Sequence, residues 1–169
     1  MSPVAPVVVV SGVAGSGKTT VGRALAERLG VPFADADDLH PPANVAKMAG
    51  GTPLDDTDRG PWLDAVAEWI KAAAHDGSGG VIACSALKRS HRDRLRRGDR
   101  SVWFVQLVAE PSVLARRMNQ RRDHFMPPGL LRSQLADLQP LAPDEPGVTV
   151  DAALSPGRII GVVMTALAR

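Results

Sequence analysis

One stretch near the start of the chain decides its fold: Val7-Val8-Val9-Val10-Ser11-Gly12-Val13-Ala14-Gly15-Ser16-Gly17-Lys18-Thr19-Thr20. Its first four residues are an apolar run, and with Ser11 they form a stretch typical of a buried strand. The next eight match the pattern G-x-x-x-x-G-K-[ST] at every fixed position. Glycines let the backbone curl so that its N–H groups face phosphate oxygens, and a following helix N-terminus adds positive charge. The sequence therefore predicts a strand, a loop that binds a nucleoside triphosphate, and a helix.

The residues of this phosphate loop, 12–19, have separate predicted tasks. We expect Lys18 to reach the β- and γ-phosphates and to take part in catalysis, and the hydroxyl of Thr19 to ligate Mg²⁺. Kinases, ATPases and GTPases share such loops, so the loop alone does not separate these classes. The predicted nucleotide-binding set is Gly12, Val13, Ala14, Gly15, Ser16, Gly17, Lys18, Thr19 and Thr20.

The rest of the chain alternates apolar runs with helical patterns. Gly30 is a predicted end for the helix after the loop, Pro61 a predicted first residue of a second helix, and Ser155-Pro156 the start of the last. Continuous apolar runs indicate strands covered on both faces. The pattern predicts an α/β fold of the P-loop NTPase kind, with a five-stranded parallel sheet wrapped by helices. Its strands after the first are Pro32–Asp35, Val81–Cys84, Val102–Val108 and Val148–Asp151.

Length and composition favour one domain over residues 1–169. Twenty Lys and Arg against eighteen Asp and Glu leave a formal charge of +2, too small a surplus to predict a nucleic-acid partner, although it suits a protein that handles anions. The single cysteine, Cys84, excludes an internal disulfide and favours a cytoplasmic setting. The apolar run 7–10 is too short for a signal peptide or a membrane span, so we expect no membrane association.

An acidic segment, Asp35-Ala36-Asp37-Asp38, ends the second predicted strand, and ligands of open α/β sheets bind at such ends. On an extended segment the carboxylates of Asp35 and Asp37 would point the same way. One could hold Mg²⁺ while the other accepts a proton from a substrate hydroxyl; the alternative is a solvated acidic turn. The third strand ends in Cys84-Ser85 and lacks a metal-binding Asp. We therefore assign the metal to Thr19 and Asp35.

Two irregular stretches, 37–60 and 121–131, interrupt the alternation and are typical of binding loops or lids. Phosphoryl transfer also needs cations that follow the developing charge. The sequence leaves open which arginine near the second stretch contacts phosphate and which packs on adenine. The candidates are Arg116, Arg117, Arg121 and Arg122.

The chain resembles the thermoresistant-type gluconokinases from about residue 7 to residue 139. The resemblance rests on ordered motifs that are together more specific than the phosphate loop. They are Asp35-Ala36-Asp37-Asp38-Leu39-His40-Pro41, Asn44, Lys47-Met48, Gly51-Thr52-Pro53-Leu54-Asp55-Asp56, Asp58-Arg59, Pro61-Trp62-Leu63, Cys84-Ser85-Ala86-Leu87-Lys88-Arg89, His124-Phe125-Met126-Pro127, Leu131 and Ser133-Gln134. At His91 we would expect Tyr in many relatives.

This resemblance implies the nucleoside-monophosphate-kinase-like fold, related to shikimate kinase, with ATP and Mg²⁺ as cofactors. It implies transfer of the ATP γ-phosphate to the 6-hydroxyl of D-gluconate by a homodimer. It also implies a substrate-binding insertion at about 37–75 and a lid at about 119–133. The implied catalytic residues are Lys18, Asp37 and Arg121, Arg117 joins the nucleotide site, and the substrate-binding residues are Asp37, His40, Lys47, Arg59, Lys88 and Arg122.

Several alternatives stay open at this point. The substrate could be another hydroxy acid such as shikimate, or a nucleotide. His40 either bonds a gluconate hydroxyl or braces its loop. Arg59 either binds the gluconate carboxylate or pairs with Asp55, Asp56 or Asp58. Trp62 and Trp69 are seven residues apart on one helical face, which favours core packing.

The basic residues around the helix that follows residue 88 also have two interpretations. A nucleic-acid-binding ATPase would use them as a phosphate-contacting surface. A solvated helix face, with one or two substrate-facing cations at its start, is the interpretation we favour, since no aromatic residues are interleaved. These residues are Lys88, Arg89, Arg92, Arg94, Arg96, Arg97 and Arg100.

Overall fold

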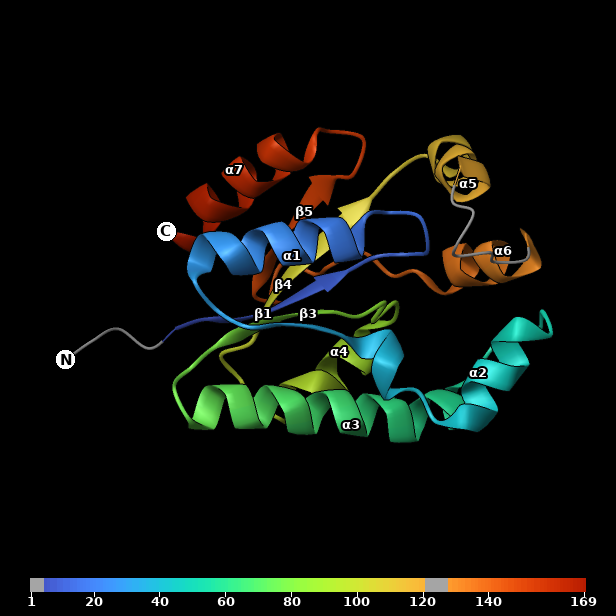
Figure 1. Ribbon diagram of the computed structural model, residues 1–169, viewed down its shortest axis with the longest axis horizontal. Helices are drawn as coiled ribbons and strands as arrows, with labels where there is room; N and C mark the ends of the chain where they lie inside the picture. Colours follow the sequence, from blue (N-terminus) through green and yellow to red (C-terminus); the bar gives the residue numbers. More distant parts are fainter. Residues whose placement is uncertain (1–4, 121–127) are drawn as a thin grey trace.

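The computed structural model describes residues 5–120 and 128–169, and Figure 1 shows the arrangement of its elements. All strands of the sheet pair in parallel, in the order β2-β3-β1-β4-β5. This confirms the predicted five-stranded parallel α/β fold, with strand ends within one residue of those expected. The strands are β1 (Val7–Ser11), β2 (Phe33–Asp35), β3 (Gly80–Ala83), β4 (Trp103–Val108) and β5 (Gly147–Asp151).

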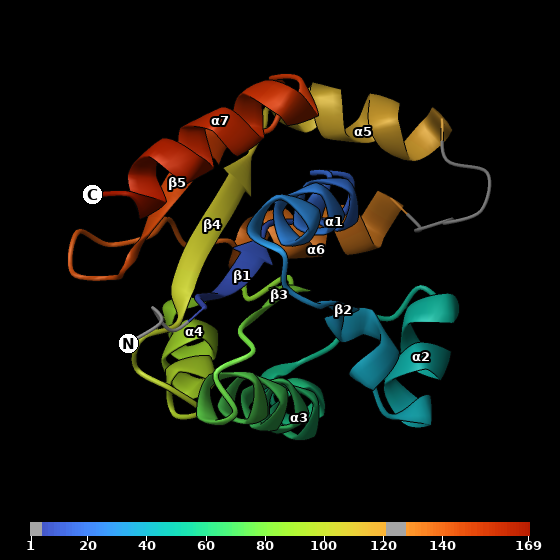
Figure 2. The same cartoon turned by 60° about the vertical axis from the view of Figure 1, so that its left-hand side comes forward.

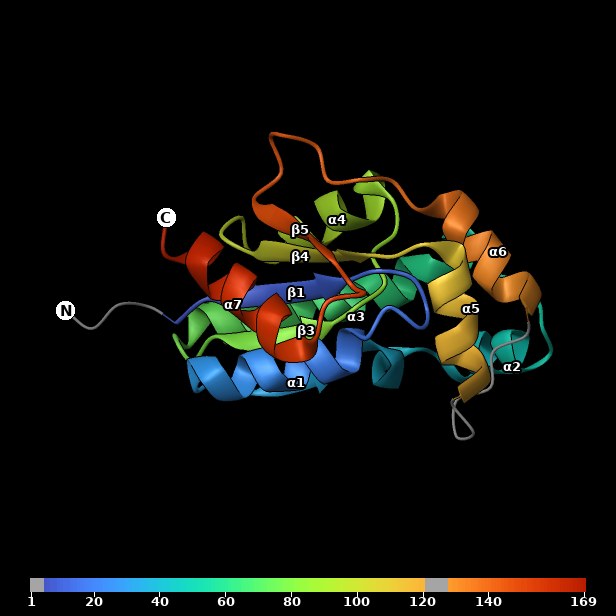
Figure 3. The same ribbon diagram turned by 90° about the horizontal axis from the view of Figure 1, so that it is seen from above.

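The helices form one layer on each face of the sheet and a third group at one end of it. In Figures 1 and 3, α1 and α7 cover one face of the sheet and α3 and α4 the other, while α2, α5 and α6 gather beyond the carboxyl ends of the strands. The helices are α1 (Lys18–Leu29), the 3-10 helix η1 (Ala36–Leu39), α2 (Pro42–Ala49), α3 (Asp56–His75), α4 (Arg89–Arg96), α5 (Pro111–Gln120), α6 (Pro128–Asp137) and α7 (Pro156–Leu167). In the described ranges no helix is both long and apolar enough to cross a membrane.

Strand β1 shows how the core is divided. Successive side chains of a strand point to opposite faces, so Val7 and Val9 pack in the cluster that includes α3, and Val8 and Val10 in the cluster of α1 and α7. All five residues of β1 are buried, as the continuous apolar run predicted. Burying each such side chain contributes about 1.5–3 kcal/mol. The central strand is thereby fixed from both sides, and it carries the phosphate loop at its end.

Two local predictions were wrong. Helix α3 begins at Asp56 and not at Pro61, because Asp55 and Asp58 form a reciprocal capping box that starts the helix earlier. Pro61 lies inside the helix, where its missing N–H removes one hydrogen bond near the N-terminus. The segment after Asp35 is a 3-10 helix and not an extended chain, because the Asp35 side chain accepts a hydrogen bond from the Asp37 amide and caps η1.

The favoured interpretation of α4 as a solvated face was wrong for Arg92. This side chain is 0% exposed and forms an ion pair with buried Glu145, through Nε to Oε2 at 2.6 Å and Nη2 to Oε1 at 3.0 Å. Its Nη1 donates to the carbonyls of Ala86, Leu87 and Gln139 at 3.0–3.2 Å. Arg92 thus joins the turn after β3 to the segment that leads from α6 to β5.

Two neighbours of Arg92 are also paired within the chain. Arg89 donates twice to Asp144, at 2.7 and 2.6 Å, and Arg94 donates twice to Asp64, at 2.7 and 2.9 Å. These pairs are partly exposed, and exposed pairs contribute little to stability. The basic cluster is therefore partly a set of bridges from α4 to other segments.

We expect Arg92→Met to lower the free energy of unfolding by about 3–5 kcal/mol, because Glu145 would be left charged and buried without a partner. Urea unfolding at pH 7 measures this change. The double variant Arg92→Met/Glu145→Leu should recover much of the loss, since it removes both charges. Arg94→Met, which breaks an exposed pair, is the matched control and should cost about 1 kcal/mol or less. An equal cost for both single variants would contradict the role given to Arg92.

Candidate active site

The phosphate loop lies where the sequence predicted it, between central strand β1 and α1. Gly12 has φ +148°, and a Cβ there would lie 2.8 Å from the carbonyl oxygen of Leu107, so only glycine fits without displacing β4. Gly17, at φ +93°, turns the chain into the first residue of α1, Lys18. The Gly12 amide donates to the Ser85 carbonyl at 3.3 Å. The loop is thereby held at the centre of the ligand-binding edge of the sheet.

The two predicted metal ligands are in contact. The Thr19 hydroxyl donates to Oδ2 of Asp35 at 2.9 Å, and Oδ1 of Asp35 accepts from the Asp37 amide at 2.9 Å. Mg²⁺ takes oxygen ligands and is usually held by one or two protein groups together with waters and substrate phosphates. A hydroxyl and a carboxylate beside a phosphate loop fit this preference. No group of three or more His, Cys, Asp or Glu able to hold a metal occurs among the described residues.

Charged site residues lie near Cys84. Burial is the main cause that raises the pKa of this thiol to about 12; the charges of Asp37 and Asp35 contribute in the same direction, and the charge of Lys18 opposes them. Charges that act on one side chain lie near it, so Lys18, Asp35 and Asp37 lie near the end of β3. The thiol stays protonated and packs in the core, as expected for a small residue of a buried strand. In addition, Lys18 Nζ donates to the Val13 carbonyl at 3.1 Å.

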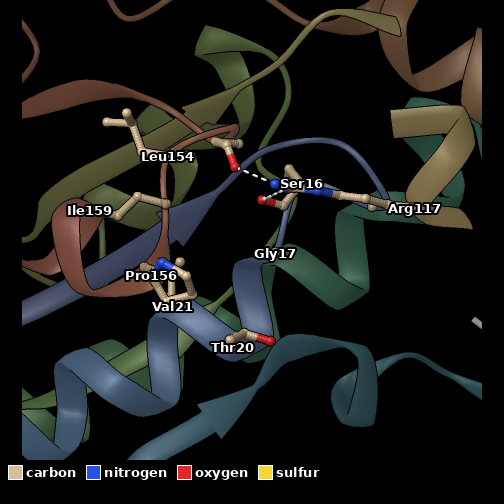
Figure 4. Close-up of a pocket in the computed structure, with 10 residues that line it drawn as sticks. Ser16, Gly17, Thr20, Val21, Arg117, Leu154, Pro156 and Ile159 are labelled. Atoms are coloured by element: carbon tan, nitrogen blue, oxygen red, sulfur yellow. Dashed lines mark hydrogen bonds between the residues drawn. The ribbon is translucent and has the colours of Figure 1, made fainter. Parts of the chain in front are cut away.

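A hollow of ≈ 250 Å³ opens beside the phosphate loop (Figure 4). Arg117 of α5 crosses it, donating from Nη2 to the Ala152 carbonyl at 2.6 Å and from Nη1 to the Ser16 carbonyl at 3.5 Å. Arg117 therefore lies beside the phosphate loop, and its nucleotide role stays a prediction. The residues that line the hollow are Gly15, Ser16, Gly17, Thr20, Val21, Arg117, Ala152, Leu154, Pro156 and Ile159.

Sequence reasoning missed the far wall of this hollow, which comes from the turn between β5 and α7. Leu154, Pro156 and Ile159 give it an apolar surface, as is common in pockets that bind small molecules. One signal could have found it: Ser155-Pro156 starts a helix directly after the last strand, at the ligand-binding edge of the sheet.

His40 braces the other side of the site. Its ring stacks on Trp62, with centroids 4.1 Å apart, and its Nδ1 lies 3.2 Å from Nδ2 of Asn44, which also donates to the Asp58 carbonyl. Because Asn44 donates, we assign Nδ1 as acceptor and the ring proton to Nε2. Burial, helped by the charge of Arg59, lowers the pKa of His40 to about 4. His40 is therefore neutral at physiological pH.

Two further residues hold this region together. Trp62 is buried in the core, as predicted, and its indole N–H donates to the Ala36 carbonyl at 2.7 Å. Lys47 of α2 pairs with Asp58 at 2.6 Å, so it connects α2 to the start of α3. The sequence motif alone predicts no role for Asn44; the structure shows it buried between η1 and α3.

The predicted substrate cations meet at Asp56. Arg59 is 7% exposed, and its Nη1 lies 3.7 Å from Asp56 Oδ1 and 3.0 Å from Oδ2 of Asp137 on α6. Lys88 donates to both oxygens of Asp56 at 3.2 Å. Its hydrogen bonds, with that of His91, hold the pKa of Asp56 below its usual range. The pairing with Asp56 was one of the open alternatives for Arg59; the pairing with Asp137 was not foreseen.

Some predicted residues lie outside the part that the structure describes. These are Arg121, assigned to catalysis, Arg122, assigned to the substrate, and the motif 124–127. Arg116, the other candidate of the arginine group, is exposed on α5.

The fold and the site define a class of protein, the small-molecule kinases built on a phosphate loop, and the family model described as shikimate kinase matches residues 14–139. A gluconokinase of Gluconobacter oxydans (strain 621H) is 47% identical over 152 residues, which cover 90% of this chain and 85% of the relative. The chain belongs to the gluconokinase family, as its motifs predicted.

Solved structures agree with this placement. A gluconokinase from Sinorhizobium meliloti 1021 has a TM-score of 0.89 at 44% identity, covering 99% of this chain and 94% of the other. A sugar kinase from Janibacter sp. HTCC2649 has a TM-score of 0.92 at 48% identity, covering 96% and 94%. These TM-scores, over nearly the whole of both chains, show that this chain has the same fold as the two kinases.

We expect Asp37→Asn to lower kcat by at least about a hundredfold, because an amide keeps the shape but cannot accept the proton of the substrate hydroxyl. Asp35→Asn should instead raise the Mg²⁺ concentration needed for half-maximal rate. Steady-state kinetics with Mg²⁺ varied separates the two effects. The matched control is Asp38→Asn, an exposed neighbour on η1. The opposite pattern for the two variants would reverse the assignment of the pair.

Proposed function

We propose that this chain transfers the γ-phosphoryl group of ATP to the 6-hydroxyl of D-gluconate, giving 6-phospho-D-gluconate and ADP. The observation that carries the proposal is the meeting, at one edge of the sheet, of a phosphate loop, an exposed carboxylate at Asp37 and the cations Arg59 and Lys88. The family relationship supports gluconate as the acceptor, since the relative from G. oxydans is named a gluconokinase and matches this chain over most of its length.

The reaction needs little covalent chemistry from the protein. A bond forms between the 6-oxygen and the γ-phosphorus, the bond from phosphorus to the β,γ-bridging oxygen breaks, and Asp37 accepts the hydroxyl proton. Lys18 and the loop amides stabilise charge on the phosphates. Thr19 and Asp35 would hold Mg²⁺, which when bound neutralises charge on the β- and γ-phosphates. The remaining task of the protein is to place the hydroxyl in line with the phosphorus.

Arg59 is our candidate for the gluconate carboxylate. Its Nη1 lies 3.7 Å from Asp56 Oδ1 and 3.0 Å from Asp137 Oδ2. A planar guanidinium has five N–H donors in a fixed fork, which suits bidentate binding of a carboxylate. Lys88 is assigned to the polyol or the transferring phosphoryl group. His40, neutral with its proton on Nε2, can donate to a hydroxyl without repelling either cation, and Lys47 completes the predicted substrate set.

Other parts of the proposal rest on the sequence and the family. We assign residues 37–75 to the substrate-binding insertion, about 119–133 to the lid, and Arg121 and Arg122 to the phosphoryl group and the substrate. We further propose that the enzyme is one kinase domain that works as a cytoplasmic homodimer without nucleic acid. Its only cysteine is buried, which suits a reducing compartment.

Measuring ADP release with a panel of acceptors tests the proposed function. We expect gluconate to give the highest kcat/KM, and shikimate, glycerate and nucleoside monophosphates to give rates near the no-acceptor background. NMR should identify the product as the 6-phosphate. Phosphorylation at any other hydroxyl would mean that the acid binds in another orientation than the one we propose. A higher kcat/KM for shikimate or a nucleotide would replace gluconate as the substrate.

We expect Arg59→Lys to raise the gluconate KM at least about tenfold with little change in the ATP KM, because one charge-assisted hydrogen bond is worth about 1.5–3 kcal/mol. Lys keeps the charge but cannot bind a carboxylate through two parallel bonds. Kinetics with gluconate and ATP varied separately provide the measurement, with Arg94→Lys on the α3–α4 surface as control. An unchanged gluconate KM, or equal rises in both constants, would make Arg59 a structural residue.

A further inference from the structure

Helix α6 contacts both halves of the proposed active site. In Figures 2 and 3 it lies beyond the end of β1, beside the phosphate loop and α5. Gln134 Oε1 accepts a hydrogen bond from the Ala14 amide of the phosphate loop at 2.7 Å. One turn later, Asp137 Oδ2 lies 3.0 Å from Nη1 of Arg59. One face of α6 therefore connects the segment that binds ATP to the side chain proposed to bind the acid.

The two contacts are separated by less than one turn of helix α6. Residues three apart lie on the same side of an α-helix and are separated by about 4.5 Å along its axis. The hydrogen bond from Ala14 to Gln134 is short, and the contact of Asp137 with Arg59 pairs opposite charges with Arg59 almost fully buried. The spacing of Ala14 and Arg59 is therefore constrained through α6.

Packing fixes α6 itself. Leu131 is buried in a small cluster with Val13 of the phosphate loop and with Leu87 and Leu114, and Leu135 and Leu138 pack against it. Just after the helix, the Gln139 amide donates to the Leu87 carbonyl at 2.8 Å. The helix thus has its own apolar anchor on the same loop that Gln134 contacts. A fixed backbone can hold the side chains of Gln134 and Asp137 in constant positions.

We propose that Gln134 and Asp137 are positioning residues that set the length of the acid that the enzyme phosphorylates. This rests on the proposed function. Gluconate is an open chain with its carboxylate at one end and its reacting hydroxyl at the other. If Arg59 binds the carboxylate and the phosphate loop holds the phosphorus, the distance between these two groups selects the chain length. Helix α6 contacts both and sets that distance.

The size of the effect follows from the geometry of attack. The reacting oxygen must come within about 3–3.5 Å of the phosphorus, and a displacement of about 1 Å costs about a hundredfold in rate. Shortening an acid by one carbon while its carboxylate stays on Arg59 moves the terminal hydroxyl by about that much. A fixed spacer should therefore make the enzyme selective for length, and a loosened spacer should reduce that selectivity.

The test is kcat/KM for aldonic acids of four, five, six and seven carbons, measured for the wild-type enzyme and for Asp137→Asn and Gln134→Ala. We expect the wild-type enzyme to prefer six carbons over five by about a hundredfold, and both variants to reduce this ratio by about tenfold or more. The matched control is Ala136→Gln, at an exposed position between the two residues, which should keep the wild-type ratio. Circular dichroism and thermal melts confirm that each variant is folded.

A second variant covers the case in which loss of the ion pair unfolds the helix. Asp137→Glu keeps the charge, adds one methylene and should change the preferred length while preserving the fold. A uniform loss of activity on all four acids, with the ratios unchanged, would make α6 merely structural and overturn the inference, as would a wild-type enzyme without length preference. A folded enzyme that phosphorylates none of these acids would instead overturn the proposed function.

Discussion

The buried ion pair between Arg92 and Glu145 is the interaction on which the arrangement of the site depends. Removing two charges from water is costly, so such a pair is tolerated only when its remaining donors and acceptors are satisfied. Burial acts to raise the pKa of Glu145, yet the Arg92 guanidinium and the Ala142 amide hold it below its usual range. The pair therefore stays charged, and the segments that contribute its partners must stay together.

Those segments are the turn after β3, which leads to Lys88, and the chain that follows α6. Arg92 fixes the turn after β3, where buried Ala86 has φ +38°, an unfavourable value for a residue with a Cβ. From this turn Lys88 extends to Asp56. On the other side, Gln106 of β4 reinforces the segment after α6 by bonding the Gln139 carbonyl and the Leu141 amide, both at 3.0 Å. A strained turn beside a site and a buried polar network that holds it are both typical of binding sites.

Two carboxylates hold side chains of the proposed site in place. Asp35 accepts a hydrogen bond from Thr19 and caps η1, and Asp56 contacts Arg59, Lys88 and His91. His91 also explains a departure from the expected Tyr. Its Nδ1 accepts the Lys88 amide at 3.2 Å and so caps α4, which a neutral imidazole can do while its Nε2–H faces Asp56 at 3.4 Å. Burial lowers the pKa of His91, which favours this neutral form.

The sequence by itself determined the phosphate loop, the parallel sheet and the family, because these depend on local patterns: an apolar run, glycines at fixed spacing and ordered motifs. It also gave reasons to predict site roles for Asp35, Asp37 and Arg117. Only the tertiary structure decided that Arg92 is buried with Glu145, that Asp137 pairs with Arg59 and that Gln134 contacts Ala14. The partners in these contacts are 53 to 120 positions apart along the chain. A charged side chain looks the same in sequence whether it meets water or a distant carboxylate, and only folding determines which it meets.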